Sequence, residues 1–120
     1  MNIYCGTDII EIKRIEKAIE TKEERFLKKI FTDKEIEYCE KKEQKYEHYA
    51  ARFAAKEAIF KAISLKTKEP IKWKMIEITN TKGGKPIVNF LEKIEKLQTI
   101  DVSISHCKDY AIANAIAIFD

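Results

Sequence analysis

The clearest structural signal in this chain is the segment Ala51-Arg52-Phe53-Ala54-Ala55-Lys56-Glu57-Ala58-Ile59-Phe60-Lys61-Ala62. It is apolar on nearly every side, a pattern typical of a buried helix, and we expect that helix to run from about Tyr46 to Leu65. Lys56, Glu57 and Lys61 nevertheless lie in its middle turns. Because a buried ion without a partner costs several kcal/mol, these charges predict fixed counter-charges, a metal ion or bound phosphates.

Strand patterns flank this helix on both sides. Ile3 to Ile9 is rich in β-forming residues and contains Gly6-Thr7-Asp8, where the glycine lets the backbone approach another segment closely. After Pro70 the apolar period changes, and Gly83-Gly84-Lys85-Pro86 predicts a hairpin turn. The later elements are expected to be strands at Trp73 to Thr81 (with a slip between Met75 and Ile76 that fits a bulge), Ile87 to Phe90, 100–106 and 110–118, and a short helix at Leu91 to Leu97.

Shorter helices are predicted before the long one. Apolar residues recur at helical spacing from Ile12 to Ile30, which indicates one or two amphipathic helices with an interruption at Thr21. Thr32 followed by Glu35 predicts a capping box that begins another helix, ending at about Cys39. With helices in the first half and strands in the second, the fold class is α+β, with a mainly antiparallel sheet against a long buried helix.

The composition predicts one ordered domain covering residues 1–120. The chain is 45% hydrophobic and 36% charged, with only three Gly and two Pro. This length supports a hydrophobic core but not a buried catalytic cleft with its own lid, so a functional site can require a second subunit. The net charge of +3 is too small to indicate nucleic-acid binding by itself.

The cysteines and the apolar runs predict a cytoplasmic protein. Cys5, Cys39 and Cys107 are odd in number and widely spaced, which is typical of reduced thiols. Met1 to Cys5 leads straight into a strand pattern, so we expect no signal peptide. No apolar run approaches the roughly 20 residues that span a bilayer, so no membrane association is expected.

Two carboxylates and a lysine are the leading candidates for chemistry. Glu57 and Lys61 are four residues apart and share a helix face, as either a supporting ion pair or part of a site. Asp8 is either a helix N-cap or, with a second carboxylate, a ligand for Mg²⁺, which takes one or two carboxylates and bridges phosphate oxygens. The spacing alone does not decide between these alternatives.

Three further features have both a structural and a functional interpretation. Ser105-His106 ends a strand, where the histidine is either a hydrogen-bonded structural residue or a catalyst. Gly83-Gly84-Lys85-Pro86 is a hairpin turn or a phosphate cradle, and lacks the length of a Walker loop. His48 follows the charged stretch Glu40 to Glu47, which we expect to be solvent-exposed.

The segment from Lys13 to Lys34 carries eight basic and five acidic residues. This excess fits an ordinary solvated face with mixed charges. It equally fits a docking surface for an acidic helix of a protein partner, since complementary potentials speed the encounter. A surface that binds DNA is usually more uniformly positive.

Four segments together resemble the holo-acyl-carrier-protein synthases, small 4'-phosphopantetheinyl transferases. They are Gly6 to Ile15, Arg52 to Ala62, Gly84-Lys85-Pro86 and Ser103-Ile104-Ser105-His106, in the order and at the intervals that the family shows. The resemblance covers essentially the whole chain. It implies transfer of 4'-phosphopantetheine from coenzyme A to a serine of acyl carrier protein in fatty acid biosynthesis, by a homotrimer with sites between subunits.

The resemblance also implies roles for individual residues. Asp8 and Glu57 would ligate Mg²⁺ on the pyrophosphate of coenzyme A, and Lys61 would contact the phosphates, stabilising charge where it develops. Adenosine and its 3'-phosphate would be held by Arg52, Gly84, Lys85, Pro86, Ser105 and His106, and the acidic carrier helix would meet Arg14, Lys17, Arg25 and Lys28. One departure is Tyr4, which stands where the family usually has a second glycine. The two rival hypotheses are a catalytically silent nucleotide- or carrier-binding module and a small nucleic-acid-binding domain.

Overall fold

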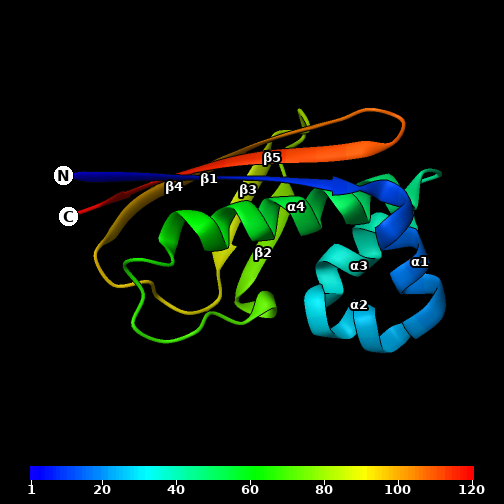
Figure 1. Ribbon diagram of the computed structural model, residues 1–120, viewed down its shortest axis with the longest axis horizontal. Helices are drawn as coiled ribbons and strands as arrows, with labels where there is room; N and C mark the ends of the chain where they lie inside the picture. The colour runs from blue at the N-terminus through cyan, green and yellow to red at the C-terminus, as the bar shows by residue number, and fades with distance from the viewer.

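Five strands and four helices form two antiparallel sheets and a helical layer in the computed structural model, which describes residues 1–120 (Figure 1). The elements in chain order are β1 (Asn2–Glu11), α1 (Ile12–Lys22), α2 (Glu24–Ile30), α3 (Asp33–Glu40), α4 (Lys45–Ile63), the 3₁₀ turn η1 (Trp73–Met75), β2 (Ile76–Asn80), β3 (Pro86–Phe90), β4 (Leu97–His106) and β5 (Tyr110–Phe119). The predicted α+β class and the long helix are confirmed. No helix is long and apolar enough to cross a membrane.

The long helix α4 packs against a three-stranded sheet in the order β1-β5-β4. Alanines face each other across this contact, with Ala54, Ala55, Ala58 and Ala62 on α4 and Ala113, Ala115 and Ala117 on β5, all buried. Small side chains on both surfaces let helix and sheet approach closely. A separate hairpin of β2 and β3 adds Ile76 and Ile78 to the same core.

Only one face of the three-stranded sheet is covered by a helix. Figure 1 shows α4 along one side of β1 and β5 and no helix along the other. On the uncovered face, Ile3, Ile9, Tyr110 and Ile116 are exposed by 59%, 59%, 46% and 44%. Large apolar side chains gathered on one surface indicate an interaction site rather than a solvated face.

The short helix expected at Leu91 to Leu97 is absent. The chain bends and turns there, and β4 begins at Leu97. The Leu91 amide donates to the Met75 carbonyl at 2.7 Å, and Lys96 adopts a positive φ of 64°. The prediction failed because the backbone bond between Leu91 and Met75 outweighs a weak local helix propensity.

The boundaries of two other elements also differ from expectation. Trp73–Met75 forms a 3₁₀ turn and β2 starts at Ile76, so the slip in the apolar pattern marks the junction of two elements and not a bulge. The break between α1 and α2 lies at Glu23, which has a φ of 48°, two residues after Thr21. The capping box of Thr32 and Glu35 is confirmed.

Gly6 is where β1 crosses α4. A Cβ at this position would lie 2.1 Å from the backbone oxygen of Ala58 and 2.9 Å from the amide nitrogen of Ala62. A real Cβ does not approach backbone atoms this closely, so any other residue would push the strand away from the helix. The glycine predicted to allow a close approach meets the helix at this crossing.

We predict that Gly6→Ala lowers the free energy of unfolding in urea by about 3 kcal/mol, because strand and helix must separate. Gly83→Ala is the matched control, since a Cβ there meets only the Thr81 Oγ1 at 3.8 Å. Equal stability of the two variants would contradict this account of the crossing.

Candidate active site

The crossing of β1 and α4 brings Asp8 to Glu57 and Lys61. Asp8 lies two residues after Gly6, so its side chain points to the same face of β1, toward α4. The Lys61 ammonium donates to the Thr7 carbonyl at 2.8 Å and lies 3.3 Å from the Asp8 Oδ1. Asp8 is therefore inside a strand, and its interpretation as a helix N-cap is wrong.

The two carboxylates are electrostatically coupled. Partial burial raises the pKa of Glu57, the negative charge of Asp8 raises it further, and Lys61 opposes both. Lys61 forms its ion pair with Asp8. The alternative i,i+4 ion pair between Lys61 and Glu57 is not formed. Like charges held side by side favour a cation between them.

This donor set fits Mg²⁺ better than a transition metal. No group of three or more His, Cys, Asp or Glu side chains gathers anywhere in residues 1–120. Such a cluster is what zinc needs, whereas Mg²⁺ is held by one or two carboxylates together with water and phosphate oxygens. Asp8 and Glu57 suffice for the second arrangement.

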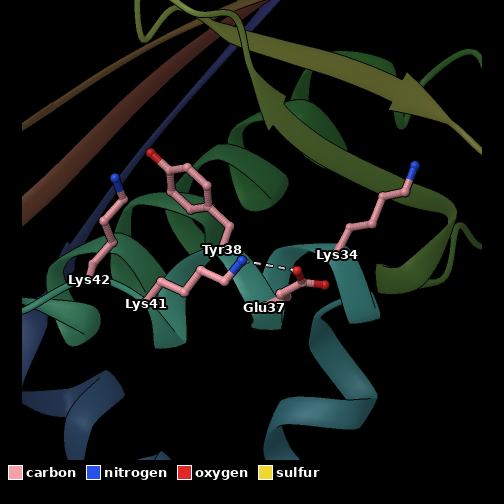
Figure 2. A pocket seen from close by; sticks show the side chains of 5 residues that line it. All are labelled: Lys34, Glu37, Tyr38, Lys41 and Lys42. Atoms are coloured by element: carbon pink, nitrogen blue, oxygen red, sulfur yellow. Dashed lines mark hydrogen bonds and ion pairs between the residues drawn. The ribbon is translucent and has the colours of Figure 1, made fainter.

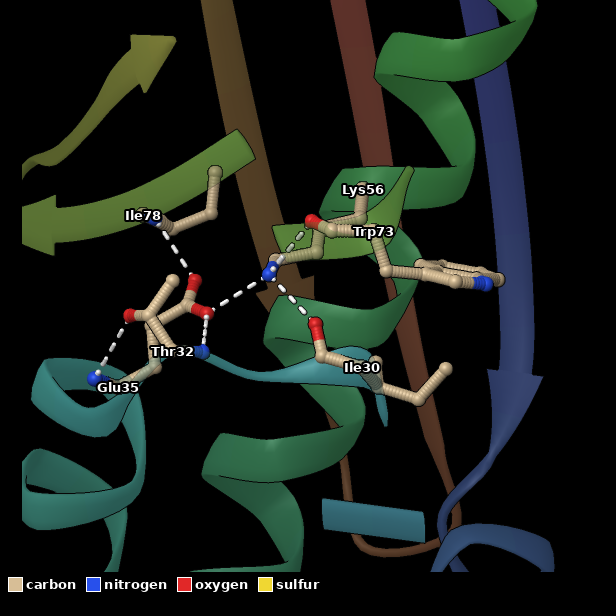
Figure 3. Close-up of polar contacts among 6 residues, drawn as sticks. All are labelled: Ile30, Thr32, Glu35, Lys56, Trp73 and Ile78. Atoms are coloured by element: carbon tan, nitrogen blue, oxygen red, sulfur yellow. Dashed lines mark hydrogen bonds and ion pairs between the residues drawn. The ribbon is translucent and has the colours of Figure 1, made fainter. Parts of the chain in front are cut away.

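Lys56, Glu57 and Lys61 on α4 have different surroundings. The Lys56 side chain is fully buried and its counter-charge is the equally buried Glu35, at 2.7 Å (Figure 3). The Lys61 side chain is instead 53% exposed, so the expectation that it is buried is wrong. Lys56 therefore belongs to the core, while Glu57 and Lys61 are free to meet a ligand.

A second group of predicted residues lies around the β2–β3 turn. Arg52 is buried, and its Nη2 donates to the Asn80 Oδ1 at 2.6 Å. The Asn80 Nδ2 in turn donates to the Gly84 carbonyl at 3.0 Å, and Gly84 takes a φ of 88° in the turn. Lys85 is exposed, 3.9 Å from the Asp101 carboxylate. Asn80 was missed from the sequence, where its only signal was a polar residue between a strand and a glycine turn.

The histidines form a third group, at the end of β4 and the start of α4. The His106 Nδ1 lies 3.9 Å from the Glu47 carboxylate, and the His106 and His48 rings are 6.5 Å apart. Ser105 is exposed, and because it precedes His106 directly in β4, its side chain points to the opposite face of the sheet. His48 was expected on the solvated surface but is half-buried, and burial and the nearby Arg52 lower its pKa.

A surface pocket of about 450 Å³ lies over α3 (Figure 2). Tyr38 forms its wall, with the Lys42 ammonium 4.8 Å from the ring centre and the Arg52 guanidinium 4.1 Å away. Glu37 and Lys41 pair across its rim at 3.1 Å. None of the predicted site residues lines this pocket.

The basic residues expected to meet a partner are all exposed on the first two helices. Arg14 and Lys17 lie on α1, and Arg25 and Lys28 lie on α2. Lys28 is 4.0 Å from Glu24 on the same face, with both side chains well exposed. A solvent-exposed pair of this kind contributes little to stability, so it leaves this lysine available to another molecule.

Comparison with known proteins identifies the superfamily of this chain. The model of the 4'-phosphopantetheinyl transferase superfamily matches residues 4–115, and the chain belongs to this superfamily. Its relatives include holo-[acyl-carrier-protein] synthases of Ruminiclostridium cellulolyticum, 45% identical over 97% of this chain and 92% of the relative, and of Chlamydia felis, 47% identical over 96% of each.

Solved structures of such synthases have the same fold. The Bacillus anthracis protein, in complex with CoA (3',5'-ADP), is 34% identical and superposes with a TM-score of 0.80 over 95% of this chain and 94% of its own. The Helicobacter pylori protein, in complex with coenzyme A, is 28% identical, with a TM-score of 0.84 over 95% and 99%.

The raised pKa of Glu57 makes a prediction about stability. A carboxyl group with a higher pKa in the folded state loses stability as pH rises from the unfolded pKa through the folded one, because the folded protein binds the proton more tightly. We therefore expect Glu57→Gln to raise the melting temperature at pH 7 in metal-free buffer.

The same measurement at pH 4, below the ordinary pKa of a glutamate, should show little difference between the two proteins. Glu16→Gln on α1 is the control, and it should leave the melting temperature unchanged at both pH values. A variant that is less stable than the parent at pH 7 would contradict the coupling of Glu57 to Asp8.

Proposed function

We propose that this protein transfers 4'-phosphopantetheine from coenzyme A to a serine of apo-acyl carrier protein, releasing adenosine 3',5'-bisphosphate. The observation that carries the proposal is the meeting of Asp8, Glu57 and Lys61 where β1 crosses α4, in a chain of the 4'-phosphopantetheinyl transferase superfamily. We assign the reaction to fatty acid biosynthesis in the cytoplasm.

Asp8 and Glu57 would hold Mg²⁺ at this crossing. When bound, the ion supplies positive charge to the diphosphate of coenzyme A. The exposed Lys61 ammonium is already tethered at the strand by the Thr7 carbonyl, so it needs little rearrangement to contact phosphate oxygens. A fixed positive charge stabilises the negative charge that develops on the leaving group.

The transfer is a substitution at phosphorus. The serine oxygen of the carrier forms a bond to the β-phosphorus, and the bond from that phosphorus to the bridging oxygen breaks. The bridging oxygen leaves on adenosine 3',5'-bisphosphate, and the serine proton passes to a water held beside Glu57.

Arg52, the residues of the β2–β3 turn and the last two residues of β4 would hold adenosine and its 3'-phosphate. These are Arg52, Gly84, Lys85, Pro86, Ser105 and His106. Arg52 supports this proposal because its Nε is buried without a hydrogen-bond partner, so the guanidinium has donor capacity left. Its link through Asn80 to Gly84 joins two of the proposed contacts.

A homotrimer would complete the site from neighbouring subunits. The apolar outer face of the three-stranded sheet, which no helix covers, is the surface we assign to subunit contact. The site residues also fall into separate groups within one chain. Contact between subunits would bring groups from two chains to one coenzyme A.

The exposed basic residues Arg14, Lys17, Arg25 and Lys28 would bind the acidic helix of the carrier protein. Arg14 is placed best for this, because α1 follows β1 directly and begins four residues after Asp8. The docked serine would then lie beside the carboxylates. Charges at the rim of an interface chiefly raise the association rate, so their removal affects carrier binding more than chemistry.

In a transfer assay, Asp8→Ala and Glu57→Ala should each lower kcat by about a thousandfold, because the metal contacts and their charge stabilisation are lost. The measurement is the gain in mass of one phosphopantetheine group on apo-carrier protein incubated with coenzyme A and Mg²⁺. Arg14→Glu is the contrasting variant, and it should raise KM for the carrier while KM for coenzyme A is retained.

Removal of Mg²⁺ with a chelator should stop transfer, and adding Mg²⁺ back should restore it. Near-full activity of the Asp8 variant at saturating Mg²⁺ would refute the metal assignment. A parent protein that binds coenzyme A but never modifies the carrier would instead establish the catalytically silent module.

Subunit contact through the open sheet face predicts that Ile116→Lys breaks the trimer, because a lysine would be buried at the interface without a counter-charge. Leu65→Lys is the control, since Leu65 is 82% exposed just beyond α4 and off this face. Sedimentation equilibrium should give three chains for the parent and the control, and one for Ile116→Lys. A monomeric parent with full activity would contradict the proposal.

A further inference from the structure

The buried pair of Glu35 and Lys56 has more partners than an ion pair needs. The Glu35 Oε1 accepts from the Lys56 ammonium at 2.7 Å and from the Thr32 amide at 2.8 Å. Its Oε2 accepts from the amide of Ile78, on β2, at 2.8 Å. Figure 3 shows the carboxylate between α3, α4 and the hairpin strand β2.

Lys56 uses all three of its donors at the same place. Besides Glu35, the ammonium donates to the carbonyls of Ile30 at 2.7 Å and Trp73 at 3.1 Å. These are the last residue of α2 and the first of η1. The pair is thus fully hydrogen-bonded, the condition under which a buried ion pair fixes one arrangement of its surroundings.

Glu35 and Lys56 each lie close in the structure to a different part of the proposed site. Ile78 lies two residues before Asn80, which joins Arg52 to the Gly84 turn. Lys56 is adjacent to Glu57 in sequence. The bond from Glu35 to the Ile78 amide links α3 to the hairpin that carries Gly84, Lys85 and Pro86. The bond from Lys56 to Glu35 extends this link to α4, next to Glu57.

We propose that Glu35 is a positioning residue for coenzyme A, because its carboxylate sets where the β2–β3 hairpin stands relative to α4. The inference rests on the proposed function, since it assigns the hairpin turn to the nucleotide. Glu35 itself is 1% exposed and touches no substrate. Its effect reaches the nucleotide through Ile78 and Asn80.

Glu35→Gln removes the acceptor of the Ile78 amide, and it also removes the counter-charge of Lys56. The amide oxygen of glutamine can keep the bonds to Lys56 and Thr32, but the amide nitrogen cannot accept from the Ile78 amide. The buried ammonium keeps the oxygen, because leaving a charge without an acceptor costs more than losing a neutral hydrogen bond. The substitution therefore removes the Glu35 bond to β2, while the Arg52 bond to Asn80 and the Lys56 bonds to Ile30 and Trp73 remain.

The test measures binding of adenosine 3',5'-bisphosphate by titration calorimetry and KM for both substrates, on protein whose folding is verified by circular dichroism. We expect Glu35→Gln to weaken nucleotide binding and raise KM for coenzyme A by about tenfold, with KM for the carrier retained. The control is Glu37→Gln, which removes an exposed ion pair on the same helix and should change neither.

A purely structural role would lower the active fraction and hence kcat, and would leave the dissociation constant and both KM values unchanged. That result, or an equal rise of both KM values, would overturn the inference. If Glu35→Gln does not fold, exchange of the Ile78 amide hydrogen in the unaltered protein decides the matter. The bond predicts slower exchange when adenosine 3',5'-bisphosphate is bound, and unchanged exchange would overturn it.

These outcomes are separate from failure of the function itself. A parent protein that never modifies the carrier would refute the proposed transfer. A parent protein that transfers normally, with a folded Glu35→Gln that binds nucleotide equally well, would refute only the positioning role.

Discussion

The close crossing of β1 over α4 at Gly6 is the constraint on which the rest of the structure depends. The contact is between backbone atoms, since a single added carbon would lie 2.1 Å from the Ala58 oxygen. Buried alanines of α4 and β5 maintain the same short separation across the sheet. Asp8, two residues beyond the crossing, can reach Lys61 only because the two backbones are this close. Packing density in the core therefore sets the geometry of the candidate metal site.

Two adjacent charged residues of α4, Lys56 and Glu57, differ in how deeply they are buried. Lys56 is fully buried and its ammonium is satisfied by one carboxylate and two carbonyls. Burial lowers its pKa, and the Glu35 carboxylate opposes this. Glu57, next along the chain, is half-buried beside Asp8 with a raised pKa. Two consecutive residues of α4 thus have different roles: Lys56 forms a structural ion pair in the core, and Glu57 is a partly exposed carboxylate next to Asp8.

Local sequence patterns predicted the helices and caps that depend on neighbouring residues. They missed the ion pair and the chain path that depend on tertiary contacts. The apolar pattern from Ala51 to Ala62 identified the buried helix, and Thr32 with Glu35 identified the start of α3. The sequence did not show that Glu35, 21 residues before Lys56, is also the counter-charge that this lysine requires. The expected helix at Leu91 to Leu97 failed for the related reason that the Met75 carbonyl, far along the chain, holds its first residue.

The candidate site residues lie in separate groups on one chain. This separation helps to explain how such a small chain can act on two large substrates. Asp8, Glu57 and Lys61 sit where β1 meets α4, whereas Arg52, Asn80 and Gly84 form a linked row toward the hairpin. A chain of this length cannot fold around coenzyme A and a carrier protein together, because most of its interior is already needed for the core. The outer face of the three-stranded sheet meanwhile leaves apolar side chains exposed. In the proposed trimer, burying that face between identical subunits would stabilise each chain and would also enclose the nucleotide, so a single contact surface would meet both requirements.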